Sequence, residues 1–181
     1  MYILKKVMEV LKGKVFSLLH VFDNTISVPS RLRLGKHVEI CARSNGKIEI
    51  KNNVVINSNS IISSLNGGNM TLQDGVSLGN NNVVVCHECI IIGKDTITGP
   101  NVFIYDHDHV FDYKNGVKKR EYTTEAVYIG KNCWIGANTV ILKGTMIGDR
   151  CVIGAGSVIK GKYADGTVII QKRDEYTINN G

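Results

Sequence analysis

The chain has 181 residues and a mass of 19.9 kDa, which is one domain's worth of protein and enough to bury a continuous core. Few aromatic residues, 19 glycines and 2 prolines, with many Ile, Val and Asn, indicate an all-β chain with short turns and argue against a helical bundle. A net charge of +6 favours anionic partners such as phosphorylated cofactors or a phospholipid surface. Nucleic acid is disfavoured as a partner, because the basic residues are scattered and no aromatic residues are interleaved with them.

The five cysteines give no sign of a disulfide framework. Only Cys86 and Cys89 approach a metal-ligand spacing, and a single Cys-x-x-Cys without a second pair is a weak zinc signal, so we expect no metal. Small buried thiols at repeat positions are the better interpretation, and an odd number of cysteines suits a reducing compartment. The N-terminus lacks a signal-peptide cleavage pattern, and its lysines interrupt the apolar residues too often for a spanning helix. We therefore expect a cytoplasmic protein.

Residues 1–24 predict an amphipathic helix. Its apolar residues recur on one face: Ile3, Leu4, Val7, Met8, Leu11, Val15, Leu18, Leu19 and Phe22. We expect the helix to cap the open end of the β structure that follows or to pack between subunits. Contact with a membrane surface is the alternative.

A period of six residues runs through residues 30–172, loosely at first and without a slip from residue 127. There the chain reads VYIGKN, CWIGAN, TVILKG, TMIGDR, CVIGAG and SVIKGK. Each repeat has one isoleucine, with a small or β-branched residue two positions before it: Ile129, Ile135, Ile141, Ile147, Ile153 and Ile159. This period fits neither an α-helix nor an ordinary strand, but it fits a triangular solenoid in which three short strands make one coil. The predicted fold is all-β, a left-handed parallel β-helix, followed by a C-terminal tail over residues 173–181.

The longest break in this period separates Ile104 from Ile129, and it predicts an excursion loop over residues 105–128. The loop is polar, rich in charge and without period. Functional residues concentrate where an insertion interrupts a regular scaffold. The loop contains His107 and His109, which an extended backbone would place on the same side. Imidazole titrates near neutrality and is suited to act as a general base.

Together with FIYDHDH, CWIGAN and CVIGAGSVI, the repeats resemble the hexapeptide-repeat acetyltransferases, in particular the sugar O-acetyltransferases of the maltose and galactoside type and their polysaccharide-biosynthesis relatives. The resemblance implies transfer of an acetyl group from acetyl-CoA to a hydroxyl of a sugar or glycan precursor. It places His109 in the family's aliphatic-Tyr-x-x-x-His position, with His107 as the alternative base. Asp106 or Asp108 is a candidate to fix the tautomer of that base.

The resemblance also implies a groove for the cofactor between the subunits of a homotrimer, where the histidine of one chain would face Trp134 of the next. Trp134 would line the pantetheine arm, with packing in the trimer as an equal alternative. The other residues implied in cofactor binding are small residues for the arm and basic residues for the phosphates: Gly136, Ala137, Gly154, Ala155, Lys160, Lys172 and Arg173. The segment 164–173 departs from the Pro-x-x-Thr-Val-x-x-Gly-x-Pro-Ala ending of the family.

Three alternatives stay open. An N-acetyltransferase of a nucleotide-linked amino sugar would differ only in its acceptor. A zinc enzyme of the γ-type carbonic anhydrase kind would need His87, His107 and His109 as metal ligands. A non-catalytic solenoid would consume no thioester.

Overall fold

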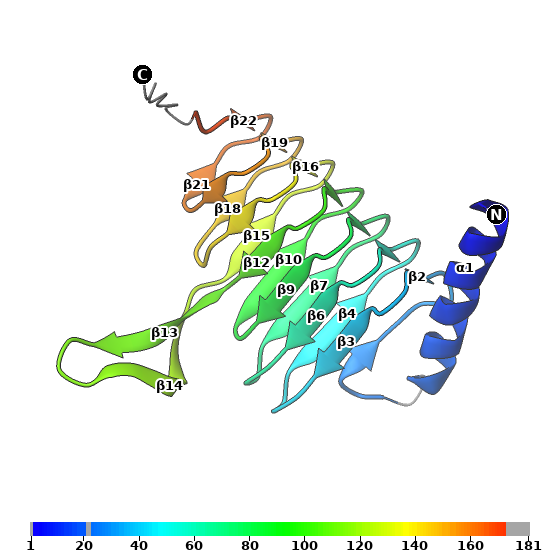
Figure 1. Cartoon of the computed structure of the whole chain (residues 1–181), viewed down its shortest axis with the longest axis horizontal. Helices are drawn as coiled ribbons and strands as arrows, with labels where there is room; N and C mark the ends of the chain where they lie inside the picture. The colour runs from blue at the N-terminus through cyan, green and yellow to red at the C-terminus, as the bar shows by residue number, and fades with distance from the viewer. Residues whose placement is uncertain (1, 21–22, 173–181) are drawn as a thin grey trace, which may run out of the picture.

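The computed structural model describes residues 2–20 and 23–172, so the expected tail over residues 173–181 lies outside the described part. One helix, α1 (Tyr2–Leu19), is followed by a stack of short parallel strands that advance along one axis (Figure 1). The predicted parallel β-helix of hexapeptide repeats is confirmed. In residues 2–20 and 23–172, no helix has the length and apolar character needed to cross a bilayer.

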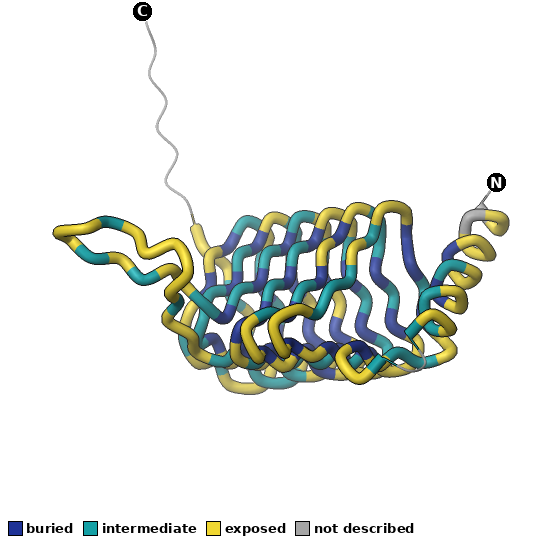
Figure 2. Tube along the Cα trace, turned by 90° about the horizontal axis from the view of Figure 1, so that it is seen from below, coloured by how far each residue is buried: buried dark blue, intermediate teal, exposed yellow. Residues whose placement is uncertain are grey.

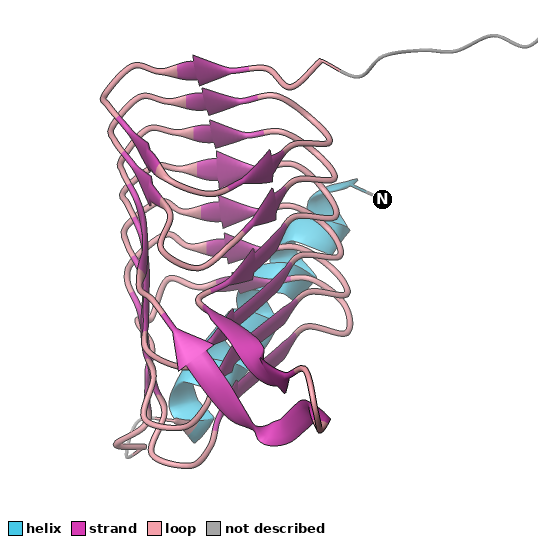
Figure 3. Ribbon diagram, turned by 90° about the vertical axis from the view of Figure 1, so that its left-hand side faces the viewer, coloured by secondary structure: helices cyan, strands magenta, loops and turns pink. Residues whose placement is uncertain are grey.

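Three parallel sheets form the sides of a triangular prism, and each coil except the last described one contributes one strand to each sheet (Figure 3). The first sheet contains β1 (Ile26–Ser27), β4 (Lys47–Ile50), β7 (Asn69–Leu72), β10 (Cys89–Ile92), β15 (Val127–Ile129), β18 (Met146–Ile147) and β21 (Lys162–Tyr163). The second sheet contains β2 (Arg33–Leu34), β5 (Val55–Ile56), β8 (Ser77–Leu78), β11 (Ile97–Thr98), β16 (Trp134–Ile135), β19 (Val152–Ile153) and β22 (Val168–Ile169). The third sheet contains β3 (Glu39–Ala42), β6 (Ile61–Ser64), β9 (Val83–Cys86), β12 (Phe103–Tyr105), β17 (Val140–Ile141) and β20 (Val158–Ile159).

The repeat has six residues because each short strand turns one aliphatic side chain inward. The isoleucines of the exact repeats are buried and form one continuous core with their upstream counterparts. The small residue of each repeat is buried at a corner, where every one except Val127 donates a side-chain hydrogen bond to a backbone carbonyl. The hydroxyl of Thr139 donates to the carbonyl of Gly136 at 2.7 Å, and that of Ser157 to the carbonyl of Gly154 at 2.6 Å. A larger residue would not fit there, so the hexapeptide pattern follows from the shape of the corner.

Asparagine is abundant because the corners need left-handed backbone. Most non-glycine residues with positive φ are asparagines, which tolerate this region better than other side chains. One corner also stacks their amides: Asn59 donates to Asn81 at 3.2 Å, Asn81 to Asn101 at 3.1 Å, and Asn101 to Asn138 at 2.9 Å. This ladder satisfies side-chain amides that would otherwise compete with the backbone.

The excursion loop leaves the solenoid at the corner between the third and first sheets. After β12 ends at Tyr105, the chain forms an antiparallel hairpin of β13 (His107–Asp112) and β14 (Gly116–Thr124) before it rejoins the first sheet at Val127. The hairpin projects from the side of the prism, in green at the lower left of Figure 1. Residues 86–89 turn the same corner one coil earlier, directly beside the base of the hairpin.

Helix α1 covers the N-terminal end of the solenoid (Figure 2). Gly13 lies so close to the first coil that a Cβ there would stand 1.8 Å from the carbonyl oxygen of Leu32. Glu9 pairs with Arg33 at 2.9 Å, and Phe16 packs against the core. These contacts agree with the expected capping role; the structure ends the helix at Leu19, and Phe22 lies outside the described residues.

The cysteines occupy the positions expected from the repeats. Cys86, Cys133 and Cys151 are buried, and Cys41 and Cys89 are half-buried, all as free thiols. Burial raises the pKa of the Cys86 thiol and of the Cys133 thiol, because the thiolate would lose its hydration. These cysteines therefore behave as small apolar core residues.

Candidate active site

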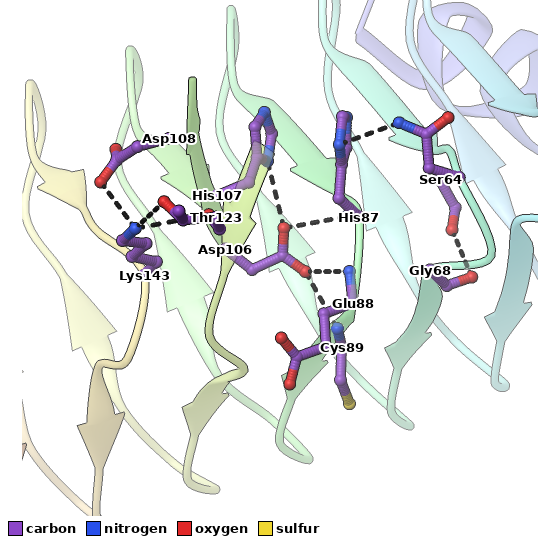
Figure 4. Close-up of polar contacts among 11 residues, drawn as sticks. Ser64, Gly68, His87, Glu88, Cys89, Asp106, His107, Asp108, Thr123 and Lys143 are labelled. Carbon is purple, nitrogen blue, oxygen red and sulfur yellow. Dashed lines mark hydrogen bonds and ion pairs between the residues drawn. The ribbon is translucent and has the colours of Figure 1, made fainter. Parts of the chain in front are cut away.

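A buried carboxylate forms the centre of the site at the corner between β12 and β13. Asp106 is fully buried and accepts three backbone N–H bonds from the neighbouring corner. The N–H of His87 donates to Oδ1 at 2.8 Å, and those of Glu88 and Cys89 donate to Oδ2 at 2.8 and 2.9 Å (Figure 4). The ring of His107 makes the fourth contact, with Nδ1 lying 3.1 Å from Oδ1.

These contacts keep Asp106 ionised despite its burial. Burial by itself would raise the pKa of the carboxyl, but the hydrogen bonds that it accepts, first from His107 and then from the backbone, hold the pKa below its ordinary value. A buried carboxylate with this many donors is fixed in both position and charge. It can therefore orient a neighbouring imidazole.

His107 is held in one tautomer by this carboxylate. An ionised carboxylate can only accept, so Nδ1 of His107 carries a hydrogen, and in the neutral ring the lone pair is then on Nε2. The side chain is 13% exposed, so part of the ring reaches solvent while most of it is covered. This is the arrangement required of a general base.

A second histidine, His87, stacks on this base from the coil below. The two rings lie 3.8 Å apart with an angle of 12° between their planes. The amide Nδ2 of Asn66 lies 3.2 Å from Nδ1 of His87, and the ring of Tyr122 contacts the stack edge-on at 4.3 Å. Burial, and then the nearby His107, lower the pKa of His87, which favours the neutral form of the ring that packs against the base.

His109, which the sequence favours as the base, lies further out on the hairpin. Its ring is exposed and packs at 4.7 Å from that of Tyr122. Because Tyr122 also contacts His107, at 5.4 Å, the two histidines lie on the same side, as predicted. Of the two aspartates expected as candidates to fix the tautomer of the base, only Asp106 contacts a histidine, His107. Asp108 pairs with Lys143 at 3.1 Å.

The stacked geometry is unsuited to a metal. Ring nitrogens of parallel imidazoles point side by side, so His87 and His107 cannot converge on one ion. Within residues 2–20 and 23–172, no group of three His, Cys, Asp or Glu side chains is placed to hold a metal ion. Within the described part of one chain, these histidines therefore do not form the arrangement that a γ-type carbonic anhydrase needs.

The residues expected to bind the cofactor lie on other parts of the prism. Trp134 is on the outer face of the second sheet, 55% exposed, between Ile97 and Val152 of the adjacent strands. That sheet lies opposite the corner that carries His107, so one chain does not bring the two side chains together. Trp134 and His107 can serve one site only if two chains contribute to it.

The small residues follow the second sheet. Ala137 is half-buried and Ala155 is exposed at the corner between the second and third sheets. Gly136 and Gly154 turn this same corner, where a Cβ on Gly136 would lie 2.5 Å from the backbone nitrogen of Ala155. The packing of adjacent coils therefore already requires glycine at position 136.

The basic residues are divided between two places. Lys160 is exposed just after β20, on the corner that carries His107 but further along the solenoid. Lys172 is exposed after the last strand, and Arg173 lies outside the described residues.

Sequence reasoning missed the supporting residues of this site. The sequence indicates His87 only as a candidate zinc ligand and has no signal for Asn66 or Tyr122. The register of the third sheet is the signal that could have found His87. Val85 pairs with Tyr105, so His87 and His107, each two residues further along, lie in adjacent coils one above the other. That register depends on the length of the coil, which varies in the upstream repeats.

Comparison with known proteins places these features in a family. Residues 126–161 match the family model for the bacterial transferase hexapeptide (six repeats). The chain is 30% identical over 135 residues to the "Putative lipopolysaccharide biosynthesis O-acetyl transferase WbbJ" of Escherichia coli (strain K12), and the match covers 70% of this chain and 69% of that protein. It is 32% identical over 102 residues to the galactoside O-acetyltransferase of Lactococcus lactis, covering 56% of this chain and about half (49%) of that enzyme.

Solved structures share the fold. An N-acyltransferase from Bacillus cereus, AntD, crystallised with dTDP and 3-hydroxybutyryl-CoA, superposes with a TM-score of 0.71 at 21% identity, over 84% of this chain and 82% of that one. A maltose O-acetyltransferase from Clostridium difficile 630 gives a TM-score of 0.53 at 23% identity, over 92% and 89% of the two chains. The resemblance that the repeats and the FIYDHDH segment indicate is confirmed by the family match and by the relative that is similar over two thirds of its length. The chain belongs to the hexapeptide-repeat acyltransferase family.

Proposed function

We propose that the protein transfers an acetyl group from acetyl-CoA to a hydroxyl of a sugar or glycan precursor, with His107 as the general base. As a member of its family the protein is an acetyltransferase, and the sugar and lipopolysaccharide O-acetyltransferases among its relatives support this acceptor class. The observation that carries the proposal is the Asp106–His107 pair, in which a buried carboxylate leaves Nε2 of the imidazole free.

The reaction needs one proton carrier. Nε2 of His107 takes the proton of the acceptor hydroxyl as its oxygen attacks the thioester carbonyl, forming a C–O bond. When the C–S bond breaks, the imidazolium returns the proton to the departing thiolate. The products are the acetyl ester and free coenzyme A, and His107 ends in its starting state.

Asp106 and His87 act through this base. The carboxylate fixes the tautomer and stabilises the imidazolium that forms during attack. The ring of His87 limits the rotation of His107, and its neutral state spares the forming imidazolium a like charge. His87 is thus a positioning residue in this proposal.

The proposed cofactor site lies between subunits of a homotrimer. Trp134, Ala137 and Ala155 would line the pantetheine arm, with Gly136 and Gly154 at the same corner. Lys160, Lys172 and Arg173 would bind the phosphates. The position of Trp134 opposite the histidine corner supports a site shared by two chains, because closed threefold packing brings different faces of identical prisms together.

The test measures thiol release from acetyl-CoA with a panel of sugars and amino sugars. We expect turnover with a hydroxyl acceptor and a loss of about 100-fold or more in His107→Asn. His109→Asn is the matched control, since this exposed residue belongs to the same strand, and it should retain activity within a few-fold. Loss of turnover in His109→Asn alone would reassign the base to the position that the sequence favours. Turnover with amino sugars only would make the protein an N-acetyltransferase, and no thiol release with any acceptor would favour a non-catalytic solenoid.

A further inference from the structure

Helix α1 uses only one side to contact the solenoid. Glu9 is buried against the first coil, Gly13 almost touches the backbone of Leu32, and Phe16 packs on the core. These positions are spaced by four and three residues and so lie on one face of the helix. The coil is therefore capped by a narrow and partly polar face.

The broad apolar face of the helix is exposed, and only its edge at Leu11, Val15 and Leu19 borders the first coil. Its side chains form one stripe with large exposed fractions: Ile3 77%, Leu4 68%, Val7 55%, Met8 47%, Leu11 52%, Val15 49%, Leu18 74% and Leu19 75%. In Figure 2 the outer side of the helix is exposed along its length. A contiguous exposed apolar patch of this kind marks an interaction site.

The charge beside this stripe is positive. The helix sequence has four lysines and one acidic residue, Glu9. That residue is on the coil side, where Arg33 pairs with it at 2.9 Å. Lys12 is half-exposed and Lys14 fully exposed on the helix, and Arg31 and Lys36 are exposed on the first coil beside it. The surface next to the stripe is thus suited to anionic groups.

An apolar groove runs between the helix and the first coil. It has a volume of about 420 Å³, and its walls include Leu11, Val15 and Leu19 of the helix and Leu34 and Val38 of the coil. Lys12 also lines it. The groove extends the apolar stripe toward the solenoid, so the apolar surface is larger than the helix alone provides.

We propose that α1 binds an anionic lipid surface, with its outward stripe in the boundary between headgroups and acyl chains and its lysines among the headgroups. A helix with one apolar face and flanking lysines lies in the plane of such a surface. Charge selects this occupant over a second copy of the chain packed stripe against stripe. Two copies packed through this stripe would bring their lysines together, whereas anionic headgroups neutralise them. The inference is independent of the proposed catalytic function.

The experiment is flotation of the full chain with vesicles of phosphatidylcholine alone or of phosphatidylcholine and phosphatidylglycerol in equal parts. We expect binding to the anionic vesicles that weakens at high salt. The double variant Leu4→Glu/Leu11→Glu should lose binding by more than tenfold. Lys12→Gln/Lys14→Gln should lose about fivefold per lysine on anionic vesicles only. Val168→Glu, which changes an apolar residue with 61% exposure on the last coil, is the matched control and should bind like the unchanged chain.

Thermal unfolding followed by circular dichroism checks that each variant folds. Because the replaced leucines are exposed, the midpoint of thermal unfolding of the leucine variant should equal that of the unchanged chain. Equal recovery of the chain with and without anionic vesicles would overturn the proposal, as would an equal loss of binding in Val168→Glu. If the leucine variant instead lowers the oligomeric mass in light scattering while no vesicle binding occurs, the stripe contacts a second copy and the lipid proposal is wrong.

Discussion

At the scale of the single residue, the proposed chemistry depends on the carboxylate behind His107. Asp106→Asn keeps the size of the side chain but removes the charge that fixes the tautomer and stabilises the imidazolium. We expect kcat to fall by at least about tenfold, with little change in KM for either substrate. Steady-state kinetics of thiol release measure both constants.

Asp108→Asn is the matched control for this prediction. Asp108 lies two residues away, and its carboxylate pairs with Lys143 rather than with a histidine. Its replacement should leave kcat within a few-fold of the unchanged protein. Equal losses in the two variants would mean that the negative charge of the corner matters and the orientation of His107 does not.

His87 gives a residue-scale prediction for the pH dependence of stability. Burial holds its pKa in the folded protein below the ordinary value of 6.5. As pH falls below that value, the unfolded chain takes up a proton that the folded chain resists, so the free energy of unfolding decreases. Above that value the contribution of His87 is complete. The slope from this one group is at most about 1.4 kcal/mol per pH unit.

Urea unfolding at several pH values between about 3 and 8 tests this assignment. His87→Phe keeps a ring that can stack on His107 and removes the titrating group. We expect the variant to lose the decrease that starts below the ordinary histidine pKa. It should keep the separate decrease at lower pH, where the depressed pKa of Asp106 acts in the same direction. Parallel curves for the two proteins would contradict the role given to His87.

At the scale of the element, adjacent residues of one short strand have opposite roles. Ile135 points into the core and is fully buried, whereas Trp134 points outward. We expect Ile135→Ala to lower the free energy of unfolding by about 2–5 kcal/mol, because it leaves a cavity between coils. Trp134→Ala should leave stability nearly unchanged and raise KM for acetyl-CoA. Chemical unfolding measures the loss of stability in Ile135→Ala, and steady-state kinetics measure the change in KM in Trp134→Ala. A drop in oligomeric mass in Trp134→Ala would instead show that Trp134 packs between subunits.

The same alternation explains which elements the sequence predicts. From Ile129 to Ile159 each strand buries one isoleucine and each corner has a fixed length, so the six-residue period identifies these coils directly. The hairpin had no such signal. Nearly all of β14 is exposed and the burial of β13 does not alternate, so neither strand of the pair shows the pattern that marks a half-buried strand.

The candidate site was only partly predictable for a related reason. The break in the period identifies the loop and both histidines, but the choice between His107 and His109 depends on which of them meets a buried carboxylate. That contact depends on the corner at residues 86–89, whose backbone N–H groups hold Asp106. Corners vary in length between the upstream coils, so their register does not follow from a fixed repeat.

At the scale of the whole molecule, the strand order implies a test of whether two chains share a site. His107→Asn removes the proposed base on one corner, and Trp134→Glu places a carboxylate on the opposite sheet, in the proposed binding surface of an anionic cofactor. Each variant alone should be nearly inactive. If the site lies between subunits, random mixing of the two variants by co-expression restores both wild-type residues at about a quarter of the interfaces.

The control for this mixing is a pair of variants on the same corner. His107→Asn and Asp106→Asn alter residues of one chain that contact each other, so no mixed interface regains an intact pair. Activity that returns to about a quarter for the first pair and not for the second requires a shared site in a closed oligomer. Failure of the first pair to regain activity, in mixed oligomers verified by mass, means that His107 and Trp134 belong to separate surfaces. Trp134 would then have no place in the catalytic site.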